Sequence, residues 1–248
     1  MQRFFIEVAY HGAGFSGFQV QENAPTIQSA IADAFRIYFR KEIALTGSSR
    51  TDAGVHALQN FFHFDWEEEW RDLWVYNLNA LLPEGIAVRK VLPVRNGAHA
   101  RFDAEARRYR YVVYTRKDPF LRDRGWHYPY RLDGALLEEL AAMVKEGIDF
   151  RSFSKRNTQV KNFECKVMES SWEWKEGGLE YRVKANRFLR GMVRALVSTM
   201  LQVGRGNRTR ADFMQLLEGT RAHAADFSAP AQGLYLEQVY YPPAIFLQ

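Results

Sequence analysis

Hydrophobic and polar residues alternate with two periods along this chain of 248 residues, and the two periods separate expected strands from expected helices. Apolar residues at every second position from Phe4 to Tyr10 are typical of a strand. Similar extended patterns occupy residues 61–64, 86–94, 107–115, 165–174, 179–186 and 233–241. Apolar residues spaced three and four apart predict helices over residues 27–38, 70–81, 136–144 and 189–204, and a short one after Thr209.

Short turns connect many of the expected strands, and the hairpin around Gly177-Gly178 is the clearest of them. Mixed elements with short connections favour an α+β fold with largely antiparallel sheets over a doubly wound parallel sheet. We expect two α/β-type halves with a boundary near residues 95–106. The expected domains are therefore residues 1–105 and residues 106–248.

Charge is divided unevenly between these halves. The chain has a formal net charge of +5, yet residues 1–105 hold 10 Lys and Arg against 13 Asp and Glu. Residues 106–248 hold 24 against 16. Clustered basic residues can neutralise the phosphates of a polyanion, although a solvated basic surface explains the same composition.

The sequence contains no pattern of an export signal or a membrane span. Met1-Gln2-Arg3 leads directly into the first strand, and no apolar run approaches the roughly 18 residues that a spanning helix needs. Cys165 is the only cysteine, which excludes an internal disulfide and a cysteine metal cluster. We therefore expect a soluble cytoplasmic protein without a membrane partner.

The chemically informative segment is residues 47–57, in which small residues surround Arg50, Asp52 and His56. An arginine near an aspartate favours the ionised carboxylate, which can act as a nucleophile or a base. The alternative is an Arg–Asp pair that braces a turn.

Other chemistries have weaker support in this sequence. His56 has no second ligand at metal spacing, and Ser48 and Ser49 are not in a nucleophile elbow. The glycines of residues 12–17 have the spacing of a dinucleotide loop, but residues 19–25 separate them from the next helix.

The segment Arg50-Thr51-Asp52-Ala53-Gly54-Val55-His56-Ala57 resembles the signature loop of the tRNA pseudouridine synthase A family. Further likenesses follow in the same order over nearly the whole chain, in residues 10–19, 25–28, 78–83, 99–102, 107–111, 192–194, 203–204 and 229–236. The resemblance implies two ferredoxin-like α/β halves with mainly antiparallel sheets that meet at a central active-site cleft. It also implies a homodimer that flips uridines of the tRNA anticodon stem-loop, typically 38, 39 and 40, and isomerises them to pseudouridine without a cofactor or metal.

The same resemblance assigns catalytic roles. Asp52 matches the essential carboxylate, which could attack the sugar C1′ or the base at C6, or remove the 2′-proton. Tyr109 matches a tyrosine that stacks on the target base and helps to remove its C5 proton. Arg50 matches an arginine that pairs with the aspartate or with a phosphate.

Other matched residues are expected to bind RNA. Arg101 matches an arginine thought to fill the space of the flipped nucleotide, and Leu234 an apolar residue against the flipped uracil. Lys155 and Arg156 lie in a segment that resembles an RNA-contacting loop, and we include His56 in this group. For Tyr109 and Leu234, plain core packing is the alternative.

Three departures from the family pattern lie in segments expected near the RNA. Phe18 stands where the family usually has Trp, Ser49 where it has Gly, and Arg190-Gly191 where an aromatic-His pair is common. They bear on the target positions more than on the reaction. A tRNA binder without turnover would not need Asp52, and a carboxylate hydrolase would pair it with a second carboxylate.

Overall fold

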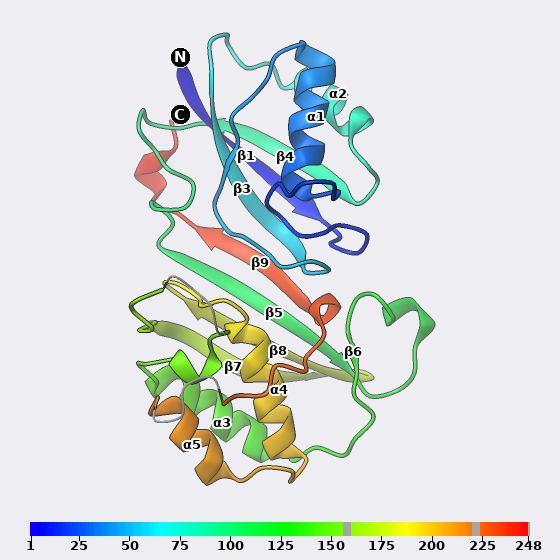
Figure 1. Ribbon diagram of the computed structural model, residues 1–248, viewed down its shortest axis with the longest axis vertical. Helices are drawn as coiled ribbons and strands as arrows, with labels where there is room; N and C mark the ends of the chain where they lie inside the picture. Colours follow the sequence, from blue (N-terminus) through cyan, green and yellow to red (C-terminus); the bar gives the residue numbers. More distant parts are fainter. Residues whose placement is uncertain (156–159, 220–223, 248) are drawn as a thin grey trace. The chain divides into compact units, whose positions relative to one another are not determined.

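The computed structural model describes residues 1–155, 160–219 and 224–247. It contains two compact units, unit 1 made of Met1–Glu105 and Tyr235–Gln248 and unit 2 made of Ala106–Leu234 (Figure 1). Both units mix strands and helices, and most strand pairs are antiparallel. The α+β class predicted from the sequence is therefore confirmed.

The C-terminal residues 235–248 belong to unit 1, whereas the sequence pattern placed them in the second domain. Strand β9 (Leu234–Tyr240) pairs in parallel with β3 (His56–Trp66), with Tyr235 opposite His56. Further on, Tyr241 packs edge-on against Phe5, with 5.1 Å between the ring centroids. This long-range pairing has no local signature, which explains why the sequence pattern missed it.

Strand β1 (Gln2–Tyr10) is central in unit 1, between β3 and β4 (Ile86–Pro93) and antiparallel to both. The two-residue strand β2 (Thr46–Gly47) adds to β3. Every residue of β1 from Phe4 onward is buried. Phe4 stacks on Phe64, whereas Phe5 meets the C-terminal segment, because successive side chains point to opposite faces of the sheet.

Two helices complete unit 1. Helix α1 (Ile27–Phe39) begins with a capping box between Thr26 and Ser29, and its Phe35 packs edge-on against Phe64 at 5.4 Å. Helix α2 (Leu73–Leu81) begins three residues later than the apolar periodicity predicts. The reason is that Trp70 precedes the helix and joins the aromatic cluster of Phe4 and Phe35.

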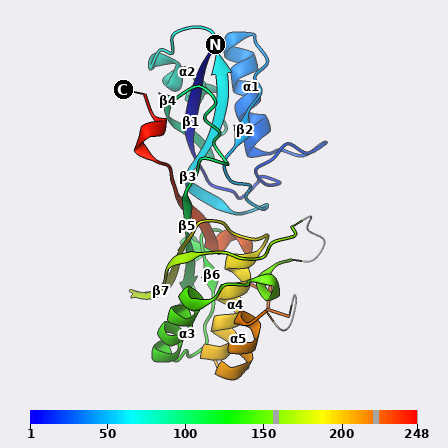
Figure 2. The same cartoon turned by 90° about the vertical axis from the view of Figure 1, so that its left-hand side faces the viewer.

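The described residues of unit 2 form a sheet and three helices. Strand β8 (Gly178–Ala185) lies between β5 (Ala106–Tyr114) and β7 (Val167–Lys175), antiparallel to both, and β6 (Trp126–His127) pairs in parallel with β5. Helices α3 (Gly134–Glu146), α4 (Met192–Gly204) and α5 (Arg210–Leu217) lie side by side (Figures 1 and 2). Single turns of 3-10 helix occupy Pro119–Leu121 (η1), Arg151–Phe153 (η2), Ala231–Gly233 (η3) and Pro243–Ile245 (η4).

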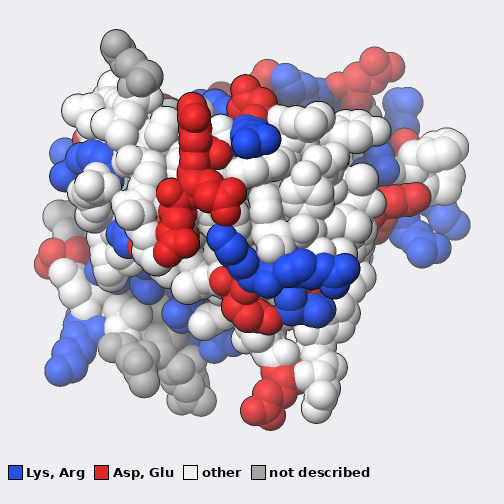
Figure 3. Space-filling view, turned by 90° about the horizontal axis from the view of Figure 1, so that it is seen from above, with Lys and Arg blue, Asp and Glu red and all other residues white. Residues whose placement is uncertain are grey.

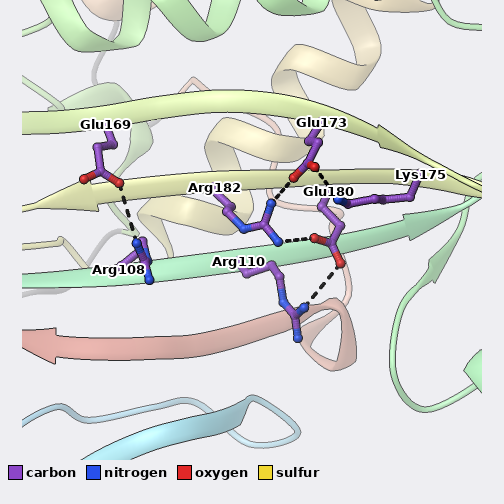
Figure 4. Close-up of polar contacts among 7 residues, drawn as sticks. All are labelled: Arg108, Arg110, Glu169, Glu173, Lys175, Glu180 and Arg182. Atoms are coloured by element: carbon purple, nitrogen blue, oxygen red, sulfur yellow. Dashed lines mark hydrogen bonds and ion pairs between the residues drawn. The ribbon is translucent and has the colours of Figure 1, made fainter.

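Alternation along β5 and β8 separates a buried face from a charged one. Tyr111 and Tyr181 are fully buried opposite each other, and burial raises the pKa of both phenols. On the other face Arg182 contacts both Glu173 and Glu180, and Glu180 also bonds Arg110 at 3.3 Å. These side chains form a ladder of opposite charges across three strands (Figure 4).

The length of the helices and the distribution of charge also bear on where the protein can bind. In the described residues no helix is long and apolar enough to cross a membrane. Lys and Arg side chains lie next to Asp and Glu side chains over the face drawn in Figure 3, so neither charge covers that face alone.

The buried hydroxyl of Tyr111 provides a test of the unit 2 core. It donates a hydrogen bond of 2.7 Å to the carbonyl of Pro230. Tyr111→Phe should lower the free energy of unfolding by about 1–2 kcal/mol, because the carbonyl of the half-buried Pro230 loses its partner. Chemical denaturation measures the loss. The control Tyr130→Phe, at a half-exposed ring, should cost less than about 0.5 kcal/mol; equal losses would contradict this account.

Candidate active site

Asp52 lies in the loop between β2 and β3, and the backbone of this loop is held on both sides of it. The Phe18 amide donates to the Thr51 carbonyl at 3.1 Å, and the Val55 amide donates to the Asp52 carbonyl at 3.1 Å. The Asp52 side chain is half-buried, whereas Thr51 and Val55 are buried. The loop therefore anchors its backbone in the core and leaves the carboxylate partly accessible.

A buried polar network supports the loop from beneath. The Tyr10 hydroxyl lies 2.8 Å from Thr51 Oγ1, and Asn60 Nδ2 donates to the Tyr10 hydroxyl at 3.1 Å and to the Ser49 carbonyl at 2.9 Å. The Asn60 Oδ1 accepts from the Phe61 amide. Sequence reasoning missed the roles of Tyr10 and Asn60. The available signal was an asparagine directly before the two phenylalanines Phe61 and Phe62 of a strand.

The glycines after β1 are explained by their packing on this loop. A Cβ atom on Gly12 would lie 2.1 Å from the Val55 carbonyl oxygen. Gly17 has a φ of +102°, and its Cβ would lie 3.2 Å from the Thr51 carbonyl oxygen. Only glycine permits this approach of two backbones. The spacing that resembles a dinucleotide loop thus has a structural cause that involves no phosphate.

His56 is buried, with 1% of its surface exposed, which gives its ring no surface for RNA. Its Nδ1 accepts a hydrogen bond of 3.0 Å from the Gly12 amide, so a neutral ring carries its proton on Nε2. The ring stacks on Tyr235 at 4.6 Å and meets His11 at 4.4 Å. We therefore replace the expected RNA contact by a supporting role at the end of the Asp52 loop.

Arg50 is exposed, and it makes no ion pair or hydrogen bond with Asp52 or with any other residue that the structure describes. The expected Arg50–Asp52 pair is therefore not formed. One residue, Thr51, lies between Arg50 and Asp52, and its backbone and side chain are both anchored. An exposed guanidinium remains suitable for a phosphate.

Tyr109 and Leu234 both belong to unit 2. Tyr109 lies on β5 opposite Val183, is 9% exposed and meets the ring of Phe188 edge-on at 4.9 Å. Leu234 is buried and begins β9, directly after a glycine whose Cβ would lie 2.5 Å from Tyr111 Cζ. The core packing weighed for both residues is thus present, and each keeps a small exposed fraction.

Lys155 is half-buried beside the start of α4, and its amide donates to the Arg190 carbonyl at 3.0 Å. A Cβ atom on Gly191, which has a φ of +77°, would lie 3.1–3.3 Å from the Lys155 side-chain carbons. The departure from the family pattern at Gly191 therefore makes room for Lys155. Arg156 lies outside the described residues.

The side chains at the other two departures, Phe18 and Ser49, are buried. Phe18 is 2% exposed and stacks on Phe62, with 4.5 Å between the ring centroids. A Cβ atom on Gly47 would lie 2.2 Å from the Phe18 ring. These two side chains fill the core beneath the Asp52 loop, and the expectation that their segments lie near the RNA stays a prediction.

Arg101 is exposed and lies at the opposite end of unit 1 from Asp52. The adjacent Ala100 amide donates to His63 Nδ1 at 3.1 Å. His63 is seven residues beyond His56 on β3, and a strand rises about 3.3 Å per residue, so the two ends lie about 23 Å apart. The structure thus does not bring Arg101 to the nucleotide at Asp52 of the same chain.

No three His, Cys, Asp or Glu residues are grouped as metal ligands in the described part of the chain. The cavity with a volume of about 540 Å³ is in unit 2 and is lined by Lys145, Cys165, Arg187 and eight neighbours. None of the expected site residues lines it.

The imidazole of His63 gives the protein a pH-dependent stability. Burial, with the nearby charge of Arg3 adding to it, lowers the pKa of His63 from 6.5 to about 4. Between these values the unfolded chain binds more protons than the folded chain, so the free energy of unfolding falls as pH falls. His99, whose pKa is also lowered, adds to this dependence.

We predict that His63→Asn, which keeps an acceptor for the Ala100 amide, flattens this dependence between pH 6.5 and about 4. Urea denaturation across the window measures it. The exposed His127 provides the matched variant His127→Asn, which should keep the wild-type dependence. Identical pH profiles for wild type and His63→Asn would contradict the role of this ring.

Comparison with known proteins identifies the family. A model of the family described as tRNA pseudouridine synthase matches residues 148–242. A protein of Parabacteroides distasonis named tRNA pseudouridine synthase A is 43% identical over 248 residues, which cover 99% of this chain and 98% of that protein. Proteins of the same name from Porphyromonas gingivalis and Staphylococcus saprophyticus are 41% and 36% identical, over 100% and 99% of this chain and 100% and 93% of theirs. The chain therefore belongs to the tRNA pseudouridine synthase A family.

Proposed function

We propose that this chain, an isomerase of the tRNA pseudouridine synthase family, converts uridine to pseudouridine in the anticodon stem-loop of tRNA. The proposed targets are positions 38, 39 and 40, and Asp52 is the catalytic carboxylate. The observation that carries the proposal is the loop around Asp52. Its backbone is anchored from both sides while its carboxylate remains partly accessible.

The reaction requires little beyond a positioned carboxylate and a flipped nucleotide. The bond between C1′ and N1 breaks, the uracil turns, and C1′ is rejoined to C5. The C5 proton leaves and N1 gains a proton, so the atoms balance without a redox partner or group donor. Asp52 attacks C1′, attacks C6 or removes the 2′-proton, and we leave these three routes open.

An anchored loop suits each of these routes. Catalysis by a carboxylate depends on a fixed distance to the reacting atom, and a fixed backbone lowers the entropy lost on reaching it. Thr51 and Val55, on either side of Asp52, are bonded to Tyr10 and to the Asp52 carbonyl respectively. The carboxylate thus moves only through its own side-chain torsions.

We assign supporting roles to three further residues. Tyr109 stacks on the target uracil and helps to remove the C5 proton, and its edge contact with Phe188 orients the ring. Leu234 packs against the flipped uracil. Arg50, exposed and without an ion pair among the described residues, binds a backbone phosphate. Flipping costs a few kcal/mol, which stacking and phosphate contacts recover.

The partner implied by this proposal is tRNA, and the excess of basic residues in residues 106–248 suits a polyanion. Lys155 and Arg156 contact phosphates in this proposal. A homodimer and a cytoplasmic location stay predictions from the sequence.

The first test follows tritium released from tRNA labelled at uridine C5. The wild type should release it from the anticodon stem-loop, and Asp52→Asn should release none while binding tRNA within about tenfold of the wild type. Asp33→Asn, on the exposed face of α1, is the matched control and should keep full activity. Turnover by Asp52→Asn, or no release by the wild type from any tRNA, would overturn the proposal.

The second test concerns the salt dependence of tRNA binding. Lys155→Gln and Arg156→Gln should each reduce the slope of log K against log salt by about one, because each removes a phosphate contact. Filter binding over a salt series measures the slope. Lys41→Gln, at a lysine paired with Glu68 in unit 1, should leave it unchanged. An unaltered slope in the double variant would exclude this loop from the RNA interface.

A further inference from the structure

Three aromatic rings contact one another in a row from the core of unit 1 to its surface, the first pair edge-on and the second tilted. His63 on β3 meets His99 at 4.6 Å, and His99 meets Phe102 at 4.2 Å. His63 is buried, whereas Phe102 is 74% exposed. An exposed aromatic ring that rests on a half-buried imidazole is a surface on which a flat group can be bound.

The backbone around Phe102 is held in place. His99 Nδ1 accepts from the amides of Arg101 at 3.1 Å and Phe102 at 3.3 Å. The His99 amide donates to Asp103 Oδ2 at 2.7 Å, and the Ala100 amide donates to His63 Nδ1. The Ala100 carbonyl accepts from the Tyr241 hydroxyl at 2.5 Å. The exposed ring therefore stands on a braced turn, which reduces the conformational entropy that a ligand must overcome.

A positive charge accompanies the ring. The guanidinium carbon of Arg101 lies 5.8 Å from the centroid of Phe102. The guanidinium lies over the ring, so an exposed aromatic surface and a cation occur together, which matches the π-face and the anionic phosphate of a nucleotide. Single-stranded nucleic acid is bound through this combination in many proteins, because stacking accepts any base.

We infer that Phe102 is a stacking platform for an unpaired base of the bound tRNA, with Arg101 on an adjacent phosphate. This inference rests on the proposed function, because the tRNA is the substrate proposed there. The platform lies about 23 Å along β3 from the Asp52 end of the same chain, so its base is not the uridine that reacts at that Asp52. Phe102 is thus a binding residue that helps to fix which segment of tRNA the enzyme accepts.

The test compares Phe102→Leu with Phe102→Tyr in the full-length protein, by filter binding with unmodified tRNA transcripts at fixed salt. Loss of the ring should raise the Kd about tenfold, whereas the tyrosine variant should bind like the wild type. Phe120 is 81% exposed in unit 2, so Phe120→Leu makes the same change at a comparably exposed ring. Its Kd should remain that of the wild type.

Tritium release measured with saturating tRNA distinguishes a failure of the Phe102 platform from a failure of the proposed function. Wild-type tritium release with an unchanged Kd for Phe102→Leu would overturn the platform alone, whereas no wild-type release would overturn the function. A Phe102→Leu protein that binds tRNA normally but changes its oligomeric state would assign the ring to a second copy of the chain and also overturn the platform. A similar rise in the Kd of Phe120→Leu would also count against a specific platform at Phe102.

Discussion

The position of Asp52 depends on close backbone packing between residues 12–18 and residues 51–55. Gly12 approaches the Val55 carbonyl so closely that a Cβ atom would overlap it, and the Phe18 amide bonds the Thr51 carbonyl. Any side chain at Gly12 would push the two segments apart. Because the loop has no regular secondary structure of its own, this contact replaces the ladder that would hold a strand.

Buried polar groups stabilise one conformation of the Asp52 loop. Asn60 serves a side-chain hydroxyl, a backbone carbonyl and a backbone amide at once, and it does so in an aromatic core. An unsatisfied group there would cost about 1–3 kcal/mol, so alternative loop conformations are disfavoured. His56 closes the other end through its bond to Gly12. Two residues that resemble reactive groups, His56 and Tyr10, are therefore parts of the support.

The two ends of β3 have different surroundings. At one end the half-buried Asp52 lies over a network of neutral hydrogen bonds. At the other end Phe102, next to Arg101, contacts His99, which meets His63 edge-on. The separation of about 23 Å between the two ends exceeds the reach of any side chain. A substrate that contacts both ends of one chain must be a macromolecule, which agrees with a family that acts on tRNA.

The sequence by itself was sufficient to predict most of the helices and strands and to indicate the family. Period-two alternation located β1 and the β7–β8 hairpin, and Thr209 marked a helix start that the structure shows as a capping box. These features were predictable because they depend on residues a few positions apart. The residues of the signature loop were sufficient to name the family.

Only the tertiary structure decided the surroundings of the site residues. In the structure His56 is buried, and Arg50 forms no ion pair with Asp52. Arg101 lies at the far end of β3, and the C-terminal strand belongs to unit 1. Each of these outcomes depends on pairing between segments far apart in the chain. A local pattern reports which face of an element is apolar, but the segment that covers that face is chosen by the packing of the whole unit.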